Sequence, residues 1–203
     1  MENKTVLVTG GARSGKSSFA ERLAARLGRR GVYVATSQAL DDEMAERIRR
    51  HRRQRDEDGF PWETVEVPYA LAERLDEITQ SAEPDTVVLV DCLTLWLSNW
   101  LLRLEADGEG AAEAEERLAA LAEQLAAVVR QSAVPLILVT NEVGSGIVPA
   151  YPLGRQFRDA AGRVNRRLAE VCGRVFLVVA GIPIDLKAAA FRMEEWDNPD
   201  EKT

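Results

Sequence analysis

A glycine-rich loop near the amino terminus constrains the fold of this chain more than any other feature. The segment Gly10–Ser17 has glycine at positions 10, 11 and 15, followed by lysine and serine. It follows an apolar run at 5–9 and precedes a segment at 19–24 with the apolar spacing of a helix. The segment therefore fits the phosphate-binding pattern G-x-x-x-x-G-K-[ST], in the strand, loop and helix context that this pattern requires.

Each part of this loop has a chemical purpose toward a triphosphate. The glycines let backbone N–H groups turn inward, Lys16 brings its charge to the β and γ phosphates, and Ser17 reaches Mg²⁺. The new helix adds the positive end of its dipole. A glycine-rich turn that binds nothing would not need all of these parts. We therefore predict nucleotide binding by Gly10, Gly11, Ala12, Arg13, Ser14, Gly15, Lys16 and Ser17.

The length of the chain favours one domain. With 203 residues it can build one full core, and it is short for two. We expect residues 1–190 to form a single P-loop nucleotide-binding domain and residues 191–203 to form a polar, disordered tail.

Composition excludes several classes of protein. A formal net charge of −7 argues against general nucleic-acid binding, which needs a cationic surface. Cys92 and Cys172 lie far apart in apolar surroundings and are typical of reduced core residues. The first residues lack a signal-peptide pattern, and no apolar run reaches the ~18 residues of a membrane span. We expect a cytoplasmic protein without a membrane span.

Apolar strands alternate with helical segments along the chain. Strands are expected at 31–35, 86–91, 135–142 and 174–180, and an exposed or edge strand at 62–67. Helices are expected up to about residue 29 and at about 44–55, 69–81, 111–131 and 153–172, with an apolar helix around residues 96–100. This alternation predicts an α/β fold, with a mostly parallel sheet and helices on both faces.

Polar residues cluster at the carboxyl ends of the expected strands. Ligands of such sheets bind outside those ends. Ser17, Thr36, Asp91, Asn141 and Glu142 all fall there.

Asp91 ends the apolar strand at 86–91. In P-loop proteins such an acid lies beside the phosphate loop and holds Mg²⁺, usually through water. We assign the metal to Ser17 and Asp91. An N-cap of the following helix is the alternative for Asp91, and the two roles are compatible. In that helix, Trp96 and Trp100 are expected in the core, with a subunit interface as the alternative.

His51 is the single histidine of the chain. On a helix it shares a face with Arg47 and Arg55, among further arginines that suit a polyanion. Like-charge repulsion would keep the imidazole neutral and nucleophilic, so that it could form a phosphoramidate with a clamped phosphate. The alternative is a solvated basic face paired with neighbouring acids. Those acids are Glu43, Glu46, Asp56 and Glu57.

Several blocks of sequence together resemble one family. The chain is similar to the bifunctional adenosylcobinamide kinase / adenosylcobinamide-phosphate guanylyltransferases of cobalamin assembly. The resemblance extends from residue 5 to about 187 in one unbroken order. The blocks that carry it are 10–17, 33–44, 47–52, 139–149 and 157–168.

This resemblance implies a RecA-like P-loop fold, a homotrimer and two reactions. A nucleoside triphosphate, ATP or GTP, phosphorylates adenosylcobinamide, with Lys16 at the triphosphate. GTP then guanylylates His51, and the GMP passes to adenosylcobinamide phosphate. The family's GTP-binding positions correspond here to the loop 10–17 and to Ala35, Thr36, Ser37, Arg52, Arg53, Gln54, Arg55, Glu66 and Asp91.

Two other functions are compatible with a P-loop. The first is a single-activity small-molecule kinase, in which His51 takes no part in the chemistry. The second is a RecA-like motor or assembly protein, which would be expected to bind a polymer. The acidic net charge disfavours the motor.

Overall fold

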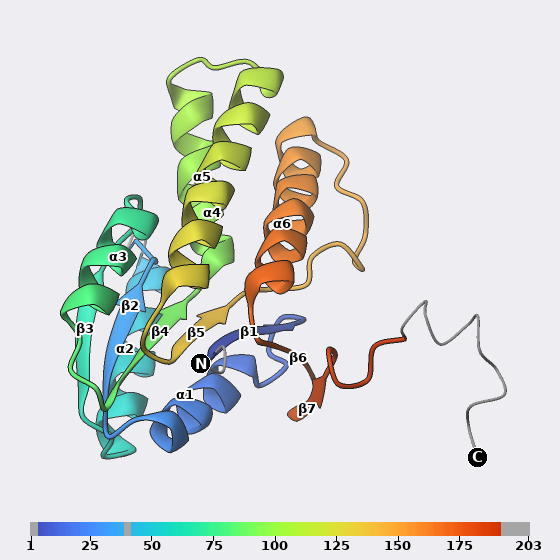
Figure 1. Ribbon diagram of the computed structural model, residues 1–203. Coiled ribbons are helices and arrows are strands. Elements are labelled where there is room, and N and C mark those ends of the chain that lie inside the picture. The colour runs from blue at the N-terminus through green and yellow to red at the C-terminus, as the bar shows by residue number, and fades with distance from the viewer. Residues whose placement is uncertain (1–3, 39–41, 192–203) are drawn as a thin grey trace, which may run out of the picture.

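The computed structural model describes residues 4–38 and 42–191 (Figure 1). It contains a seven-stranded sheet in the order β3-β2-β4-β5-β1-β6-β7. The strands are β1 Thr5–Gly10, β2 Arg30–Ala35, β3 Trp62–Glu66, β4 Thr86–Asp91, β5 Leu136–Val139, β6 Arg174–Val179 and β7 Ile182–Asp185. The helices are α1 Lys16–Leu27, α2 Asp42–Glu57, α3 Leu71–Ser81, α4 Leu93–Ala106, α5 Ala111–Gln131 and α6 Pro152–Val171.

Side chains that alternate along each strand supply two apolar faces. In β4, Val88 and Val90 belong to the cluster that α3, α4, α5 and α6 cover. Val87 and Leu89 point to the opposite cluster, which α1 covers. Figure 1 shows the tall helices α4, α5 and α6 rising from one side and α1 lying on the other. The predicted α/β fold with helices on both faces is confirmed.

The strand order brings three chain segments together at the carboxyl ends of the parallel strands, a region called here the carboxyl edge of the sheet. β5 lies between β1 and β4, since Leu136 pairs with both Thr5 and Val88. Strands β1 to β6 run parallel, so their carboxyl ends meet at this edge. The P-loop after β1, the polar residues after β5 and Asp91 at the end of β4 therefore lie side by side.

A final hairpin departs from the sequence prediction. The strand at 174–180 is the last one predicted from the sequence, but β7 follows it and pairs antiparallel with β6 at the edge of the sheet. Ala180 and Gly181 connect the two strands, and both have positive φ, of 51° and 81°. Positive φ at both central residues is what a tight type I′ hairpin turn requires. The part of the predicted tail at 192–203 lies outside the described residues.

The apolar helix α4 contributes to the core. Trp96 is 1% exposed, and its indole N–H donates to the carbonyl oxygen of Tyr69 at 2.8 Å. The half-buried Trp100 donates to the same oxygen at 3.1 Å. The core assignment is therefore confirmed for Trp96.

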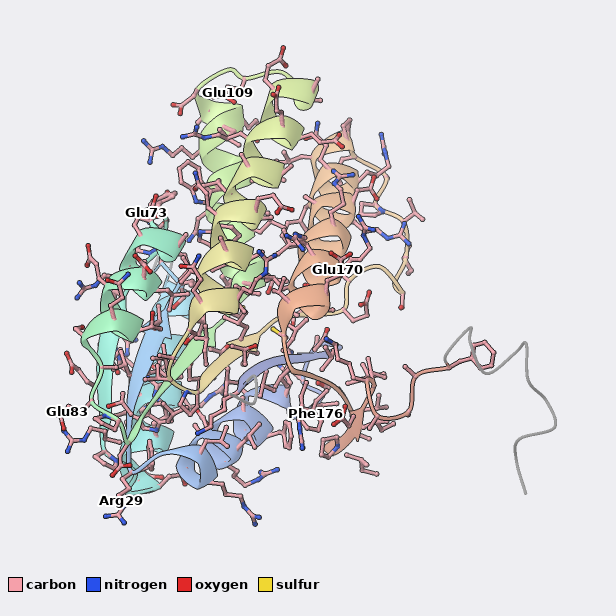
Figure 2. The ribbon with its side chains drawn as sticks, viewed as in Figure 1. Arg29, Glu73, Glu83, Glu109, Glu170 and Phe176 are labelled. Carbon is pink, nitrogen blue, oxygen red and sulfur yellow. The ribbon has the colours of Figure 1, made fainter. Side chains whose placement is uncertain are left out.

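Charged side chains such as Glu73 and Glu170 project from the outer surface (Figure 2).

The two cysteines also follow the prediction. Cys92 and Cys172 are buried free thiols. Burial raises the pKa of each thiol to about 11, so neither is a reactive thiolate near neutral pH. In the described ranges, no helix is long and apolar enough to cross a membrane.

Candidate active site

The P-loop has room only for glycine at two positions. A β carbon on Gly10 would lie 2.5 Å from the carbonyl oxygen of Val178, and one on Gly15 would lie 3.3 Å from the Cα of Gly181. Gly15 also has a φ of 90°, which L side chains rarely adopt. The turn after β6 therefore packs directly against the phosphate loop.

Hydrogen bonds fix the path of this loop. The Gly181 N–H donates to the Ser14 carbonyl at 2.8 Å, and the Ser14 N–H donates to the Gly11 carbonyl at 3.3 Å. The Lys16 ammonium donates to that same Gly11 oxygen at 3.1 Å, which holds its charge over the loop. This geometry suits a phosphate, because backbone N–H groups and a cation converge where α1 begins.

Thr36 links the end of β2 to the start of α4. Its hydroxyl donates to the Cys92 carbonyl at 2.7 Å and accepts from the Cys92 N–H at 3.0 Å. The Asn99 amide donates to the Thr36 carbonyl at 2.9 Å. Thr36 is fully buried, between the buried Ala35 and the half-buried Ser37. Contact of these three residues with a nucleotide stays a prediction, and the Thr36 hydroxyl is already satisfied.

Asp91 lies half-buried at the end of β4, opposite Ala35 of β2. Its Oδ2 accepts a hydrogen bond from the Tyr33 hydroxyl at 3.1 Å. The N-cap residue of α4 is Cys92, without a side-chain capping bond. The N-cap role considered for Asp91 is therefore wrong, and its carboxylate remains at the carboxyl edge.

A buried charged cluster lies beside Asp91. The Arg55 guanidinium carbon is 3.6 Å from the centroid of the Tyr33 ring, and Arg55 is 4% exposed. Burial raises the pKa of Glu21 on α1 to about 7, and Arg55 opposes this rise while Asp91 and Asp58 add to it. Burial, reinforced by Asp91, raises the pKa of Tyr33, so its hydroxyl stays a hydrogen-bond donor.

His51 lies within α2, but its side chain is outside the described residues, as are those of Arg47 and Gln54. The described arginines of α2 have varied partners. Exposed Arg52 pairs with Glu66, and Arg53 pairs with Glu46 at 3.0 Å.

Two interpretations of α2 follow from its sequence: a polyanion-binding helix, or a solvated basic face paired with neighbouring acids. The pairing of Glu46 with Arg49 and Arg53 matches the solvated basic face. The buried Arg55 does not, because it packs against the sheet. Nucleotide contacts by Arg52, Arg53, Gln54, Arg55 and Glu66 stay a prediction.

Asn141 is a candidate that the sequence-based site omitted. It follows β5, between the strands of the P-loop and of Asp91. Its Nδ2 donates to the Thr94 hydroxyl at 3.1 Å, while its Oδ1 is buried with no partner among the described residues. In the sequence, Asn141 is recognisable as a polar residue that follows a buried strand. Its position between the P-loop and Asp91 follows only from the strand order. A buried unpaired polar atom calls for an explanation, such as a bound ligand.

The oxygen donors at this edge fit magnesium. Ser17 in the first turn of α1 and Asp91 at the end of β4 offer a hydroxyl and a carboxylate. Over residues 4–38 and 42–191, no group of three or more His, Cys, Asp or Glu could hold a metal. Mg²⁺ is usually bound through one or two protein oxygens together with several waters and substrate phosphates, and the Ser17 hydroxyl and the Asp91 carboxylate are oxygen donors of this kind.

Comparison with known proteins decides the family. The family model described as cobinamide kinase / cobinamide phosphate guanyltransferase matches residues 6–186. The chain belongs to this family. The match includes the P-loop, all of α2 and the hairpin of β6 and β7.

Curated relatives of the cobinamide kinase / cobinamide phosphate guanyltransferase family match nearly end to end. The bifunctional adenosylcobalamin biosynthesis protein CobP of Pseudomonas aeruginosa is 44% identical over 181 residues, covering 89% of this chain and 96% of that protein. The bifunctional adenosylcobalamin biosynthesis protein CobU of Escherichia coli is 43% identical over 187 residues, covering 90% and 99%.

The similarity to solved structures concerns the fold alone. The prototypical ATPase from the type III secretion system of pathogenic bacteria has a TM-score of 0.51 at 9% identity. The match covers 96% of this chain and 60% of that chain. The RecA-like P-loop fold expected for the family is thus confirmed.

Proposed function

We propose that this protein is an adenosylcobinamide kinase and adenosylcobinamide-phosphate guanylyltransferase. It phosphorylates adenosylcobinamide with a nucleoside triphosphate, then transfers GMP from GTP through a histidine to adenosylcobinamide phosphate. The observation that carries this proposal is membership of the family over residues 6–186. The relatives named bifunctional match it over nearly their whole length.

In the kinase step, the acceptor hydroxyl oxygen bonds to the γ phosphorus while the bond to the β-phosphate oxygen breaks. The hydroxyl proton is released, and the nucleoside diphosphate leaves. Positioning and charge dominate such a transfer. Lys16 and the loop N–H groups neutralise the developing negative charge. Ser17 and Asp91 would hold Mg²⁺, which when bound neutralises the phosphates further.

In the guanylyl step, an imidazole nitrogen of His51 attacks the α phosphorus of GTP and pyrophosphate leaves. A phosphate oxygen of adenosylcobinamide phosphate then attacks the same phosphorus, and the nitrogen–phosphorus bond breaks. The products are adenosylcobinamide-GDP and free His51. Covalent catalysis of this kind divides one difficult transfer into two easier ones. The arginines that neighbour His51 in the sequence would disfavour a protonated imidazole and so favour its nucleophilic form.

The proposed nucleotide contacts lie at the carboxyl edge and on α2. The ion pair of Arg52 with Glu66 supports a shared role, since it brings α2 to the end of β3. The Glu66 carboxylate would accept a hydrogen bond from a ribose hydroxyl. The full set is Gly10 to Ser17, Ala35 to Ser37, Arg52 to Arg55, Glu66 and Asp91.

Three further properties belong to this proposal. The resemblance to the family supports a homotrimer. The two buried free thiols are compatible with the reducing cytoplasm. The single seven-stranded sheet supports one nucleotide-binding domain over residues 1–190.

Incubation with GTP labelled at the α phosphorus tests the proposal. The wild-type protein should acquire label that is stable to alkali and labile to acid, as expected for a phosphoramidate. Addition of adenosylcobinamide phosphate should chase the label into product. His51→Asn, which removes the nucleophile, should abolish labelling and retain phosphorylation of adenosylcobinamide. A wild-type protein that phosphorylates adenosylcobinamide and never acquires label would leave only the single-activity kinase.

A further inference from the structure

The attachment of α2 to the sheet includes an unusual contact. A surface helix is generally held by a stripe of apolar side chains. Among the α2 side chains that the structure describes, seven are exposed and the buried one is Arg55. A cation, rather than an apolar side chain, thus forms this point of attachment.

The contact of Arg55 is well defined. Its guanidinium carbon lies 3.6 Å from the centroid of the Tyr33 ring, well within the range of a cation–π interaction. Such an interaction strengthens when the cation is removed from water, and Arg55 is 4% exposed. The Arg55 guanidinium also interacts electrostatically with the carboxyl of Glu21 on α1.

Tyr33 is a rigid support for that cation. It lies in β2, inside the sheet, and is 6% exposed. Its ring makes an edge-to-face contact with Trp62, with centroids 5.8 Å apart and planes at 86°. Its hydroxyl donates to Asp91 at 3.1 Å. Because neighbouring strands hold the ring on two sides, the sheet determines where Arg55 can rest.

The spacing along α2 connects this support to the proposed nucleophile. His51 precedes Arg55 by four residues, so the two share one helix face about one turn apart. A fixed Arg55 limits both rotation and sliding of that turn. Displacement of a reacting group by about 1 Å can cost roughly 100-fold in rate.

We infer that Tyr33 is a positioning residue for guanylyl transfer: its ring supports Arg55 and thereby fixes the turn of α2 that carries His51. This inference rests on the proposed function. Tyr33 acts through Arg55 and α2, and touches neither reacting phosphorus. The kinase step depends on the P-loop and on the Asp91 carboxylate, and the contact of the Tyr33 ring with Arg55 is part of neither, so the kinase step does not need this support.

Two substitutions of Tyr33 separate the contribution of its aromatic ring from that of its hydroxyl group. Tyr33→Phe removes the hydrogen bond to Asp91 and keeps the aromatic face, whereas Tyr33→Leu removes both. With α-labelled GTP, we expect Tyr33→Phe to label within about threefold of the wild-type rate. The Tyr33→Leu protein should take up label at least about tenfold more slowly. We expect this decrease in kcat, with the KM for GTP unchanged. Kinase rates with ATP should stay within about threefold in both variants.

Limited trypsin digestion gives a readout independent of activity. Tyr33→Leu should raise cleavage at the arginines of α2 at least about fivefold over Tyr33→Phe, while the rest of the chain stays resistant. Tyr33→Met, which fills similar volume without a π face, repeats both assays if the leucine variant fails to fold.

Several results would overturn the inference. They are wild-type labelling by the variants that lack the ring, a parallel loss of both activities in a folded variant, or an equal loss in Tyr33→Phe. The last result would assign the effect to the Asp91 hydrogen bond. A wild-type protein that takes up no label refutes the proposed function instead, so the two failures are distinguishable.

Discussion

Gly15 and Gly181 meet where the phosphate loop contacts the last hairpin of the sheet. A β carbon on Gly15 would approach the Gly181 Cα to 3.3 Å, and the neighbouring Gly181 N–H donates to the Ser14 carbonyl at 2.8 Å. The loop therefore depends on residues more than 160 positions away in the chain. The P-loop is held in shape before any nucleotide arrives.

Gly15→Ala should destabilise the protein and weaken nucleotide binding. The new methyl group meets a backbone atom, and a φ of 90° is strained for alanine, at a cost of about 1–3 kcal/mol. Thermal unfolding without nucleotide measures this cost. Gly11→Ala is the matched control, since no atom lies within 4 Å of its new methyl group. Equal melting temperatures for the two variants would contradict the argument.

Lys16→Ala should abolish the kinase step and weaken guanylylation. The ammonium lies over the P-loop, 3.1 Å from the Gly11 oxygen, where it can neutralise a bound phosphate. Loss of one such charge costs at least about 100-fold in rate. Initial rates with adenosylcobinamide and ATP, together with labelling by GTP, measure both steps. A full kinase rate in Lys16→Ala would mean that the γ phosphate binds elsewhere.

Asp91→Asn should increase the Mg²⁺ concentration needed for half-maximal activity by at least about tenfold. The substitution removes the charge, while the amide oxygen can still accept the Tyr33 hydrogen bond. The fold is thereby preserved, and a thermal melt checks it. Titration of Mg²⁺ at fixed nucleotide gives the result. An unchanged requirement would remove Asp91 from the metal site.

Asn141→Leu should lower the kinase rate at least about tenfold with little effect on the melting temperature. The leucine replaces an amide whose Oδ1 is buried and unpaired among the described residues, so little stabilisation is lost. Asn141 follows β5, which lies between β1 and β4, so its amide lies at the strand ends where we propose that the phosphates bind. Thr94→Val, which removes the partner hydroxyl, is the companion variant. A folded Asn141→Leu with an unchanged kinase rate would exclude such contact.

Local sequence patterns were sufficient for most of the fold. The helix at 111–131 was predicted with the bounds of α5, and the P-loop began and ended with the expected strand and helix. Apolar periodicity and glycine placement are local signals, so they survive in a single sequence. The hairpin strand β7 was missed, because four residues that include Pro183 form too short a pattern at a sheet edge.

The site was less predictable than the fold, because its key contacts join distant segments. Nothing in the run of arginines distinguishes buried Arg55 from exposed Arg53, since the difference depends on Tyr33 lying beneath one of them. Asn141 was likewise expected at a strand end, but its place between the P-loop and Asp91 was known only when β5 was found between β1 and β4. Residue types predict the chemistry, whereas strand order and partner burial decide which residues share a site.

Glu21 makes the stability of the protein depend on pH. Burial raises the pKa of its carboxyl from 4.5 to about 7. Between these values the folded protein holds a proton that the unfolded chain has released. The stabilising contribution of this group is therefore complete below about pH 4.5 and is lost as pH rises through about 7.

The glutamine in Glu21→Gln cannot ionise, so the variant should not lose stability in this way as pH rises. Relative to wild type, the variant should be about equally stable near pH 4.5 and more stable by about 1–2 kcal/mol at pH 8, an amount discounted because the carboxyl is only partly buried. Denaturant unfolding across this range measures the difference. Exposed Glu109→Gln controls for the loss of one negative charge. A variant that instead becomes less stable than wild type as pH rises would mean that attraction to Arg55 outweighs the cost of burying the carboxylate.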